Sequence, residues 1–161
     1  MKIYGAWLDH PGTQALCAAL SVAGHQALFV GGSVRNALLG VPVSDIDIAT
    51  DAPPEIVTNI AQNAGFRVIP TGLDHGTVTV LALGAVHEGT TFRRDVQTDG
   101  RHATVAFTAD IAQDAARRDF TMNALYADAR GTVMDPLGGL PDLLARRVRF
   151  VGDADTRIRE D

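Results

Sequence analysis

The chain has 161 residues, of which 46% are hydrophobic and 20% are charged, and its formal net charge is −5. This composition excludes a disordered chain, which would be poorer in hydrophobic residues, and a protein that binds nucleic acid over its whole surface, which would be basic. No apolar run approaches the length of a spanning helix and the N-terminus does not resemble a secretory signal, so we expect a cytoplasmic protein with no membrane partner. The single cysteine, Cys17, lies in an apolar stretch and is expected to be a buried, unreactive thiol.

The spacing of apolar residues predicts helices alternating with strands through residue 107 and a mostly helical pattern from residue 109 onward. Ser33 is expected to cap the second predicted helix. This order of elements is typical of an α+β or α/β fold in which a small mixed sheet is backed by helices. Helices are expected over residues 12–23, 34–39 and 53–64, and strands over 27–30, 44–49, 66–69, 77–83, 86–92 and 103–107.

A glycine turn lies between the first predicted strand and the helix that follows it. Its sequence is Gly31-Gly32-Ser33-Val34-Arg35. Glycines at such a place let backbone amides approach a phosphate group, and the helix N-terminus adds partial positive charge. A Gly-Gly pair between a strand and a helix is more often only a turn, so this motif gains weight only together with others.

Two aspartates, Asp45 and Asp47, alternate with Ile46 and Ile48 in the next predicted strand. Side chains two positions apart share one face of a strand, so both carboxylates are expected to point one way while the isoleucines face the core. Two like charges on one face are unfavourable unless a cation lies between them, and Mg²⁺ prefers oxygen ligands. We therefore favour a magnesium site over a solvated polar face of the strand.

Glu88, in the predicted strand over residues 86–92, is a third acid. On a strand adjacent to the aspartates it would lie within about 5 Å of one of them. Two-metal nucleotidyl transfer uses carboxylates grouped in this way. Taken by itself, Glu88 fits a metal ligand and an exposed acid equally well.

The run Arg117-Arg118-Asp119-Phe120-Thr121-Met122-Asn123-Ala124 combines two guanidinium groups, a carboxylate and an amide. Such a composition suits the binding of phosphates and sugar hydroxyls, and a capping and salt-bridge cluster is the alternative. Of the 13 arginines, 11 lie from Arg93 onward, so anion contacts are expected in this part of the chain.

In this order, the motifs resemble the N-terminal region of class II CCA-adding tRNA nucleotidyltransferases and bacterial poly(A) polymerases, members of the polymerase-beta-like nucleotidyltransferase superfamily. The resemblance covers about residues 28–161. The matching segments are Phe29 to Arg35, Asp45 to Thr50, His75 to Val78, Glu88, Thr90 to Arg93, Asp99 to Arg101, Arg117 to Ala124, and Asp135-Pro136.

The resemblance implies a fold, a reaction and a set of site residues. It implies a polymerase-beta-like palm in which the 3′-hydroxyl of a tRNA attacks the α-phosphate of CTP or ATP and releases pyrophosphate. By resemblance, Asp45 and Asp47 hold two Mg²⁺ ions and Glu88 is the third carboxylate. Nucleotide binding is implied for Gly31, Gly32, Ser33 and Arg35 at the triphosphate, for Arg118, Asp119 and Asn123 at the phosphate and ribose, and for Asp161.

Two departures from the family pattern stand out. Position 36 is Asn where many relatives carry Asp, which changes a local hydrogen bond or charge. At the other end, Glu160 and Asp161 match the first two positions of the family's Glu-Asp-x-x-Arg helix, which selects the incoming base. We therefore expect a nucleotidyltransferase head over residues 1–138 and the helical start of a neck over residues 139–161, without the part that holds tRNA.

Alternatives to the CCA-adding function stay open. A poly(A) polymerase would share the same head. A module that binds nucleotide or metal without turnover is a second alternative, with poor discrimination between CTP and ATP. A third is a small antibiotic-modifying or toxin-type nucleotidyltransferase, against which the run from Arg117 to Ala124 argues.

Overall fold

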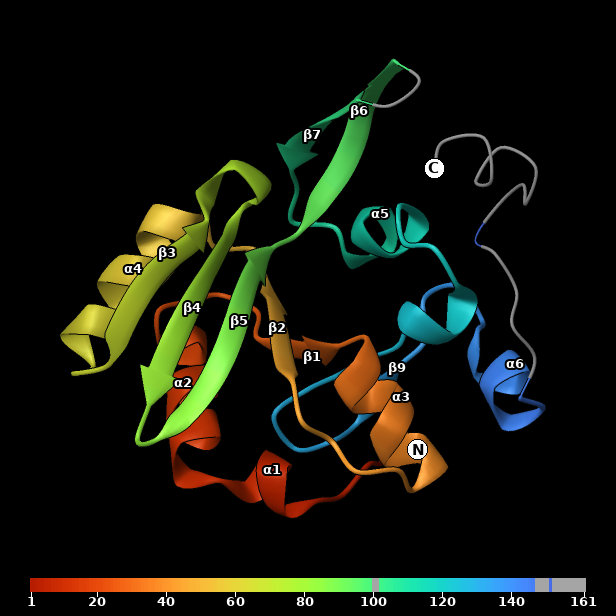
Figure 1. The fold of residues 1–161 in the computed structure, drawn as a ribbon, viewed down its shortest axis with the longest axis horizontal. Helices are drawn as coiled ribbons and strands as arrows, with labels where there is room; N and C mark the ends of the chain where they lie inside the picture. The colour runs from red at the N-terminus through yellow and green to blue at the C-terminus, as the bar shows by residue number, and fades with distance from the viewer. Residues whose placement is uncertain (100–101, 147–150, 152–161) are drawn as a thin grey trace.

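The computed structural model describes residues 1–99, 102–146 and 151. Within these residues, nine strands form a seven-stranded sheet in the order β3-β4-β5-β2-β1-β8-β9 and a separate ribbon, β6-β7, that projects away from it (Figure 1). Their bounds are β1 Leu28–Val30, β2 Ile46–Thr50, β3 Arg67–Gly72, β4 Thr77–Ala82, β5 Ala85–Thr91, β6 Arg93–Asp99, β7 His102–Phe107, β8 Tyr126–Ala127 and β9 Val133–Met134.

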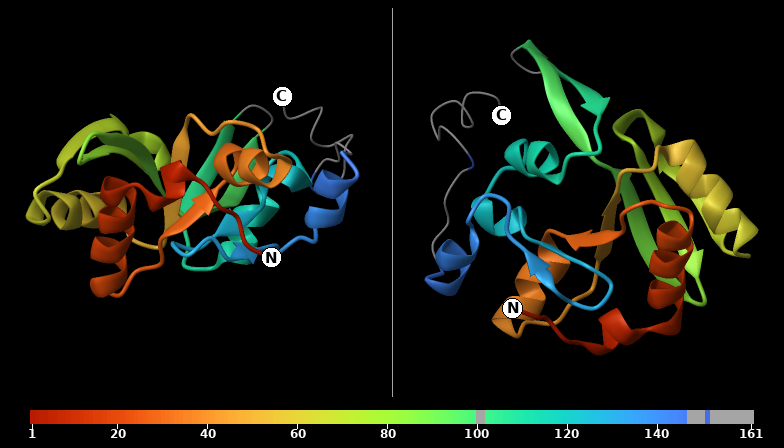
Figure 2. Two further views of the ribbon diagram at one scale, coloured as in Figure 1. Left: turned by 90° about the horizontal axis from the view of Figure 1, so that it is seen from below. Right: turned by 180° about the vertical axis from the view of Figure 1, so that it is seen from behind.

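Helices cover both faces of the sheet. Helices α2 and α4 pack side by side against the β3-β4-β5 part, and α3 packs against β1 and β2 (Figure 2). Val34 of α3 belongs to the same buried cluster as residues of α2 and α4, whereas Ala115 of α5 lies in the cluster on the opposite face. The bounds are α1 Ala6–Asp9, α2 Pro11–Val22, α3 Gly32–Leu39, α4 Pro54–Asn63, α5 Ile111–Ala116 and α6 Leu140–Leu144, with 3-10 turns η1 Leu73–His75 and η2 Thr121–Asn123. Of the helices in the described residues, none is long and apolar enough to cross a membrane.

Alternation along β2 separates two buried clusters. Ile48 belongs to the larger cluster, which also contains Leu16 of α2 and Val57 of α4. Ala49, the next residue, belongs to a second cluster together with Ala115 of α5 and Tyr126 of β8. Since successive side chains point to opposite faces, Asp47 lies on the same face as Ala49, opposite to α2 and α4.

Strand pairing sets the relative positions of the acids. Only β2 and β5 pair in parallel among the named pairs of the described sheet, and their register places Asp47 opposite Glu88. The remaining named pairs are antiparallel, including β1 with β2 and β1 with β8. The expected mixed sheet backed by helices is therefore confirmed.

The structure corrects several details of the sequence interpretation. The described residues after 109 are not mostly helical, because β8 and β9 extend the sheet beyond β1. Strands of two residues are too short to show a period of two in the sequence. The helix α1 and the strand β6 were also not expected.

Ser33 does not cap α3. The N-cap residue is Gly31, and Ser33 lies within the helix, where its hydroxyl donates to the Val30 carbonyl at 3.4 Å. No side chain therefore caps the first turn of α3, and its backbone amides remain available to donate hydrogen bonds.

The predicted neck is described only in part. Within it, α6 contributes Leu143 to the larger cluster, and Asp142 accepts a hydrogen bond from the Thr121 hydroxyl at 2.9 Å. The described beginning of this segment is thus packed on the head. Asp161 and Glu160 lie outside the described residues, and the boundary after residue 138 stays a prediction.

Candidate active site

The glycine turn joins β1 to α3 through a backbone conformation that requires glycine. Gly31 has φ 74° and ψ −132°, which an L side chain rarely adopts. Gly32 begins the helix directly after it, so the free amides of the first helical turn lie at this bend. The strand end is buried, since Phe29 and Val30 belong to the two core clusters on opposite faces of the sheet.

The three acids predicted from the sequence meet on one face of the sheet. Asp45 lies directly before β2 and is exposed, while Asp47 is half-buried within β2. Glu88 stands opposite Asp47 on β5, as expected, and its Oε1 accepts a hydrogen bond from the Thr79 hydroxyl at 3.1 Å. The interval along the strand and the parallel register together explain this grouping.

Two hollows meet at the aspartates. One, of about 240 Å³, extends from Asp45 and Asp47 to Gly32, Ser33 and Arg35 of α3. The other contains the same two aspartates together with Glu88. The structure therefore brings the glycine turn and all three acids to one continuous concave surface.

Negative charge is concentrated on this surface. Burial raises the pKa of Asp47, the neighbouring Glu88 and Asp45 raise it further, and Arg118 opposes them. Such crowding favours a bound cation. Within the described part of the chain no three acidic, imidazole or thiol groups are arranged to hold a metal ion. On this surface the carboxylates of Asp45 and Asp47 are the groups that could hold one, with other oxygens completing its coordination.

A chain of hydrogen bonds connects Arg35, which follows the glycine turn, to the run from Arg117 to Ala124. Arg35 Nη1 donates to Asn123 Oδ1 at 2.9 Å, and Asn123 Nδ2 donates to Asp119 Oδ1 at 3.2 Å. Arg35 Nε also donates to Asn36 Oδ1 at 3.1 Å. The residues that the resemblance assigned to the triphosphate and to the ribose therefore touch each other.

Arg118 lies in a cluster that the sequence interpretation missed. Its Nη2 donates to Asp114 Oδ2 at 3.0 Å and its Nε donates to the Tyr126 hydroxyl at 3.2 Å. The Tyr126 hydroxyl in turn donates to the same Asp114 oxygen at 2.6 Å. Asp114 is 1% exposed, and the spacing of four residues to Arg118 on a helical segment was the signal that could have found it.

Two further arginines approach Asp114. Arg117 Nε lies 3.4 Å from Asp114 Oδ1, and the Arg93 backbone amide donates to the same oxygen at 3.1 Å. Burial alone would raise the pKa of Asp114, but Arg118, Tyr126 and Arg117 outweigh it and hold this pKa below its usual value. Asp114 is therefore ionised in the folded protein at neutral pH.

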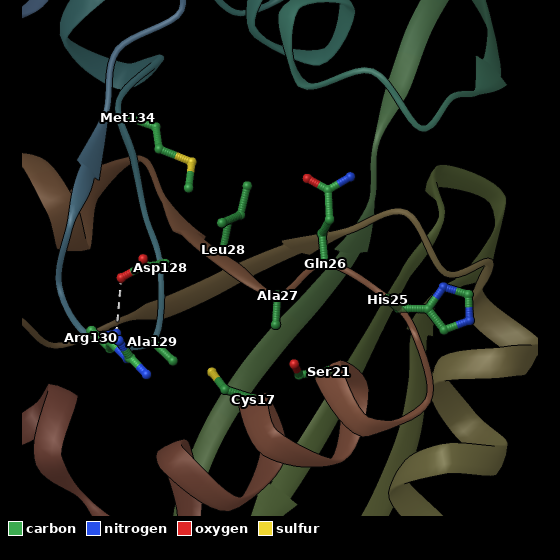
Figure 3. A pocket seen from close by; sticks show the side chains of 10 residues that line it. All are labelled: Cys17, Ser21, His25, Gln26, Ala27, Leu28, Asp128, Ala129, Arg130 and Met134. Atoms are coloured by element: carbon green, nitrogen blue, oxygen red, sulfur yellow. Dashed lines mark hydrogen bonds between the residues drawn. The ribbon is translucent and has the colours of Figure 1, made fainter.

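A separate hollow lies on another side of the molecule, between α2, the beginning of β1 and the β8-β9 hairpin (Figure 3). Cys17 and Ser21 line it from α2, and Met134 lines it from β9. Burial raises the pKa of Cys17 to about 12, so its thiol stays protonated, as the sequence suggested. None of the predicted site residues that the structure describes lines this hollow.

The sequence of this chain matches a known protein family and several named proteins. The family model described as the Poly A polymerase head domain matches residues 27–149. The CCA-adding enzyme of Geobacillus thermodenitrificans is 46% identical over 140 residues, which are 86% of this chain and 34% of that protein. The mitochondrial CCA tRNA nucleotidyltransferase 1 of Mus musculus is 43% identical over 151 residues, 93% of this chain and 35% of that protein.

Solved structures agree with the sequence matches. The Bacillus stearothermophilus CCA-adding enzyme in complex with CTP superimposes with a TM-score of 0.85 at 40% identity, over 98% of this chain and 37% of that one. A tRNA nucleotidyltransferase complexed with a primer tRNA and an incoming ATP analog superimposes with a TM-score of 0.67 at 30% identity, over 85% of this chain and 39% of that one. The chain spans about a third of the length of the curated relatives it matches.

Proposed function

This chain belongs to the Poly A polymerase head domain family, and from that premise we propose that it is the catalytic head of a nucleotidyltransferase that adds CMP and AMP to the 3′ end of tRNA. The relatives with 43% to 48% identity are named CCA-adding enzymes or CCA tRNA nucleotidyltransferases, which favours this substrate. The proposed partners are the tRNA 3′ end, CTP and ATP.

One observation carries the proposal. Asp45 and Asp47 line a single hollow with the glycine turn and Arg35, while Glu88 stands opposite Asp47 in the parallel register of β2 and β5. A triphosphate placed in this hollow has backbone amides and a guanidinium group on one side and carboxylates on the other. That arrangement suits a nucleotide whose reacting phosphate faces the acids.

We infer that the reaction on this surface is a nucleotidyl transfer. The 3′-hydroxyl loses its proton to solvent and its oxygen forms a bond to the α-phosphorus, while the bond from that phosphorus to the bridging oxygen breaks and pyrophosphate leaves. Gly31 and Gly32 bind the triphosphate through backbone amides, and Arg35 offsets its negative charge. Asn123 and Asp119, joined to Arg35 by hydrogen bonds, orient the ribose.

Asp45 and Asp47 are the residues that would hold Mg²⁺, and Glu88 adds negative charge beside them. When bound, the metal ions would make the attacking hydroxyl more acidic and stabilise the charge on the leaving group. Thr79 keeps the Glu88 carboxylate on this face through its hydroxyl. In this proposal Asp45 and Asp47 bind the metal directly, and Glu88 acts through its charge.

Nucleotide binding gives the first test. The affinity of the chain for CTP and ATP in the presence of Mg²⁺ is measured by calorimetry before and after the double substitution Asp45→Asn/Asp47→Asn. Binding is expected to weaken by at least about tenfold, since both groups that hold the cation lose their charge. The matched control is Asp9→Asn/Asp74→Asn, which makes the same charge change at exposed positions away from the hollow. Equal affinity of the parent chain and the active-site variant would overturn the proposal.

The reaction itself separates the CCA-adding function from its alternative. Extension is followed with a tRNA that lacks its terminal CCA and with an unstructured RNA. Addition of C, C and A to the tRNA alone supports the proposal. Long adenylate tails on both RNAs would assign poly(A) synthesis instead, and nucleotide binding without any extension would assign a binding module.

A further inference from the structure

Two arginine side chains and a backbone amide surround one buried carboxylate next to the candidate site. Arg117 and Arg118 form ion pairs with Asp114, and the backbone amide of Arg93 donates to it. Removing one partner of a buried ion pair leaves an uncompensated charge, so Asp114 and Arg118 are expected to stay paired in the folded protein.

The side chain of Arg93 adds a further guanidinium group near this carboxylate, and its Nη1 donates to the His75 carbonyl at 3.0 Å. Burial and Arg118 lower the pKa of Arg93, whereas Asp114 and Asp95 raise it. The Arg93 Nε atom is buried and has no hydrogen-bond partner among the residues that the structure describes. The cluster is thus built with more donors than it uses internally.

The bonds within the cluster fix the orientation of Arg118. Asp114 and the Tyr126 hydroxyl bind Nη2 and Nε, which form one edge of the guanidinium plane, and Tyr126 also donates to Asp114. Because the guanidinium group is planar, this closed ring of bonds determines where the opposite Nη1 end lies. Arg118 additionally stacks on the Tyr126 ring, with 5.6 Å between its central carbon and the ring centroid.

The position of Tyr126 places the cluster at the glycine turn. In the register of β1 and β8, Tyr126 stands opposite Val30, the residue directly before Gly31. The charge of Arg118 is also felt at Asp47, whose pKa it lowers against the effects of burial and Glu88. The guanidinium group of Arg118 is therefore close enough to Asp47 for its charge to act on that carboxylate.

We infer that Asp114 is a positioning residue for nucleotide binding, which holds the guanidinium group of Arg118, together with the Tyr126 hydroxyl, in the orientation that binds the phosphates of the incoming nucleotide. This inference rests on the proposed function and adds two residues to it. Asp114 and Tyr126 do not contact the nucleotide themselves but act on it by holding Arg118. Their removal is expected to lower the affinity for the phosphates and to leave the three acids of the sheet face in place.

A double-mutant cycle tests this inference. The dissociation constants for Mg·CTP are measured for the parent chain, Asp114→Asn, Arg118→Ala and the combination of both. Each single substitution is expected to weaken binding by about tenfold, the size of a lost charge-assisted hydrogen bond. The double variant is expected to bind within about twofold of Arg118→Ala, because Asp114 acts through a group that is already missing. Independent, multiplying losses would overturn the inference.

Two further measurements separate positioning from folding. Asp110→Asn changes the same charge at the N-cap of α5, where the side chain accepts from the Ala112 amide, and it is expected to leave the affinity unchanged. An equal loss in this control would show that Asp114 acts through helix stability and would overturn the inference. The loss for Mg·CTP is also expected to exceed the loss for CMP, whereas a general loosening of the site would affect both alike.

Tyr126→Phe keeps the test decisive if Asp114→Asn does not fold. It removes only the hydroxyl that accepts from Arg118, and binding is expected to weaken by about threefold. Unchanged affinity in this folded variant would overturn the inference while leaving the proposed function intact. A parent chain that binds no Mg·CTP at all would overturn the proposed function and this inference with it.

Discussion

Arg35 donates a hydrogen bond from Nη1 to Asn123 Oδ1 over 2.9 Å and so joins helix α3 to the turn η2 across 88 positions of the sequence. The same asparagine donates to Asp119, so the carboxylate of Asp119 is linked indirectly to the glycine turn. Two segments that the sequence presents as separate motifs are therefore joined by hydrogen bonds. Its geometry depends on a single amide side chain.

Replacing that amide tests the link. Asn123→Ala removes the acceptor for Arg35 and the donor to Asp119, and nucleotide affinity is expected to fall by about tenfold because both groups lose their fixed orientation. The measurement is calorimetric titration with Mg·CTP. Asn59→Ala, an exposed asparagine of α4, is the matched control. Equal affinities of the two variants would contradict a role of Asn123 in ordering the site.

A substitution at Glu88 can remove the negative charge of this side chain while keeping its size. Glu88→Gln keeps an oxygen that accepts from the Thr79 hydroxyl but removes a negative charge next to Asp47. Nucleotide binding is expected to change little, while the rate of tRNA extension falls about a hundredfold, as when one preorganised electrostatic group is lost. Glu55→Gln on α4 serves as the control for lost charge. A full extension rate in Glu88→Gln would exclude Glu88 from the reaction.

The local parts of this site could be predicted from the sequence because they depend on short-range rules. Alternation of acids with isoleucines gave the shared face of Asp45 and Asp47, and glycines between a strand and a helix gave the turn. The sequence predicts only that Glu88 could lie beside one of the two aspartates, and the parallel register places it opposite Asp47. Such pairing is not encoded in either strand alone.

The burial of the cluster around Asp114 could not be predicted in this way, although the spacing between Asp114 and Arg118 suits an ion pair. Its members come from α5, from the segment after it, from β6 and from β8, and a two-residue strand such as β8 leaves no periodic signal. An aspartate on a polar helical segment is most often exposed, so only tertiary packing shows that Asp114 is buried. Tyr126 lies in the part of the chain for which the sequence predicts mostly helix, and the structure places it in β8.

Packing of α2 against the sheet gives a prediction of stability. A Cβ added at Gly12 would overlap the carbonyl oxygen of Ala82 in β4. Helix propensity alone would favour alanine by up to about 1 kcal/mol, but a clash with backbone forces α2 away from the sheet and is expected to cost about 2 kcal/mol or more. Urea unfolding measures the difference, with Ser21→Ala on the same helix as the control. A Gly12→Ala variant as stable as the parent would show that α2 is free to shift.

The buried pair Thr13 and His87 predicts a pH dependence. His87 Nε2 lies 2.8 Å from the Thr13 hydroxyl, and its Nδ1 lies 3.2 Å from the Val80 carbonyl. Burial lowers the pKa of His87, and the bond to Val80 opposes this only in part. The unfolded chain therefore binds a proton near pH 6.5 before the folded chain does, so the folded state loses stability as the pH falls below about 6.5.

The measurement is the free energy of unfolding at pH 8 and at pH 5.5. In the variant His87→Gln the decrease between the two pH values is expected to be smaller than in the parent, since the buried titrating group is gone. His75→Gln, at an exposed position, is expected to retain the decrease. An identical decrease in the parent and in His87→Gln would mean that His87 does not contribute to it.

Asn36 is the position at which this chain departs from many of the proteins it resembles, and the structure gives the departure a physical meaning. Its Oδ1 accepts from Arg35 Nε at 3.1 Å, and its Nδ2 donates to the Pro42 carbonyl at 3.2 Å, which tethers the loop that leads to Asp45. An aspartate would keep the first bond, lose the second and add negative charge to the hollow that Asn36 lines.

Asn36→Asp is therefore expected to weaken Mg·CTP binding by about threefold to tenfold at low ionic strength and by less at high salt. Asn59→Asp adds the same charge on α4, and only an equal effect in both variants, or tighter binding in Asn36→Asp, would contradict this local explanation.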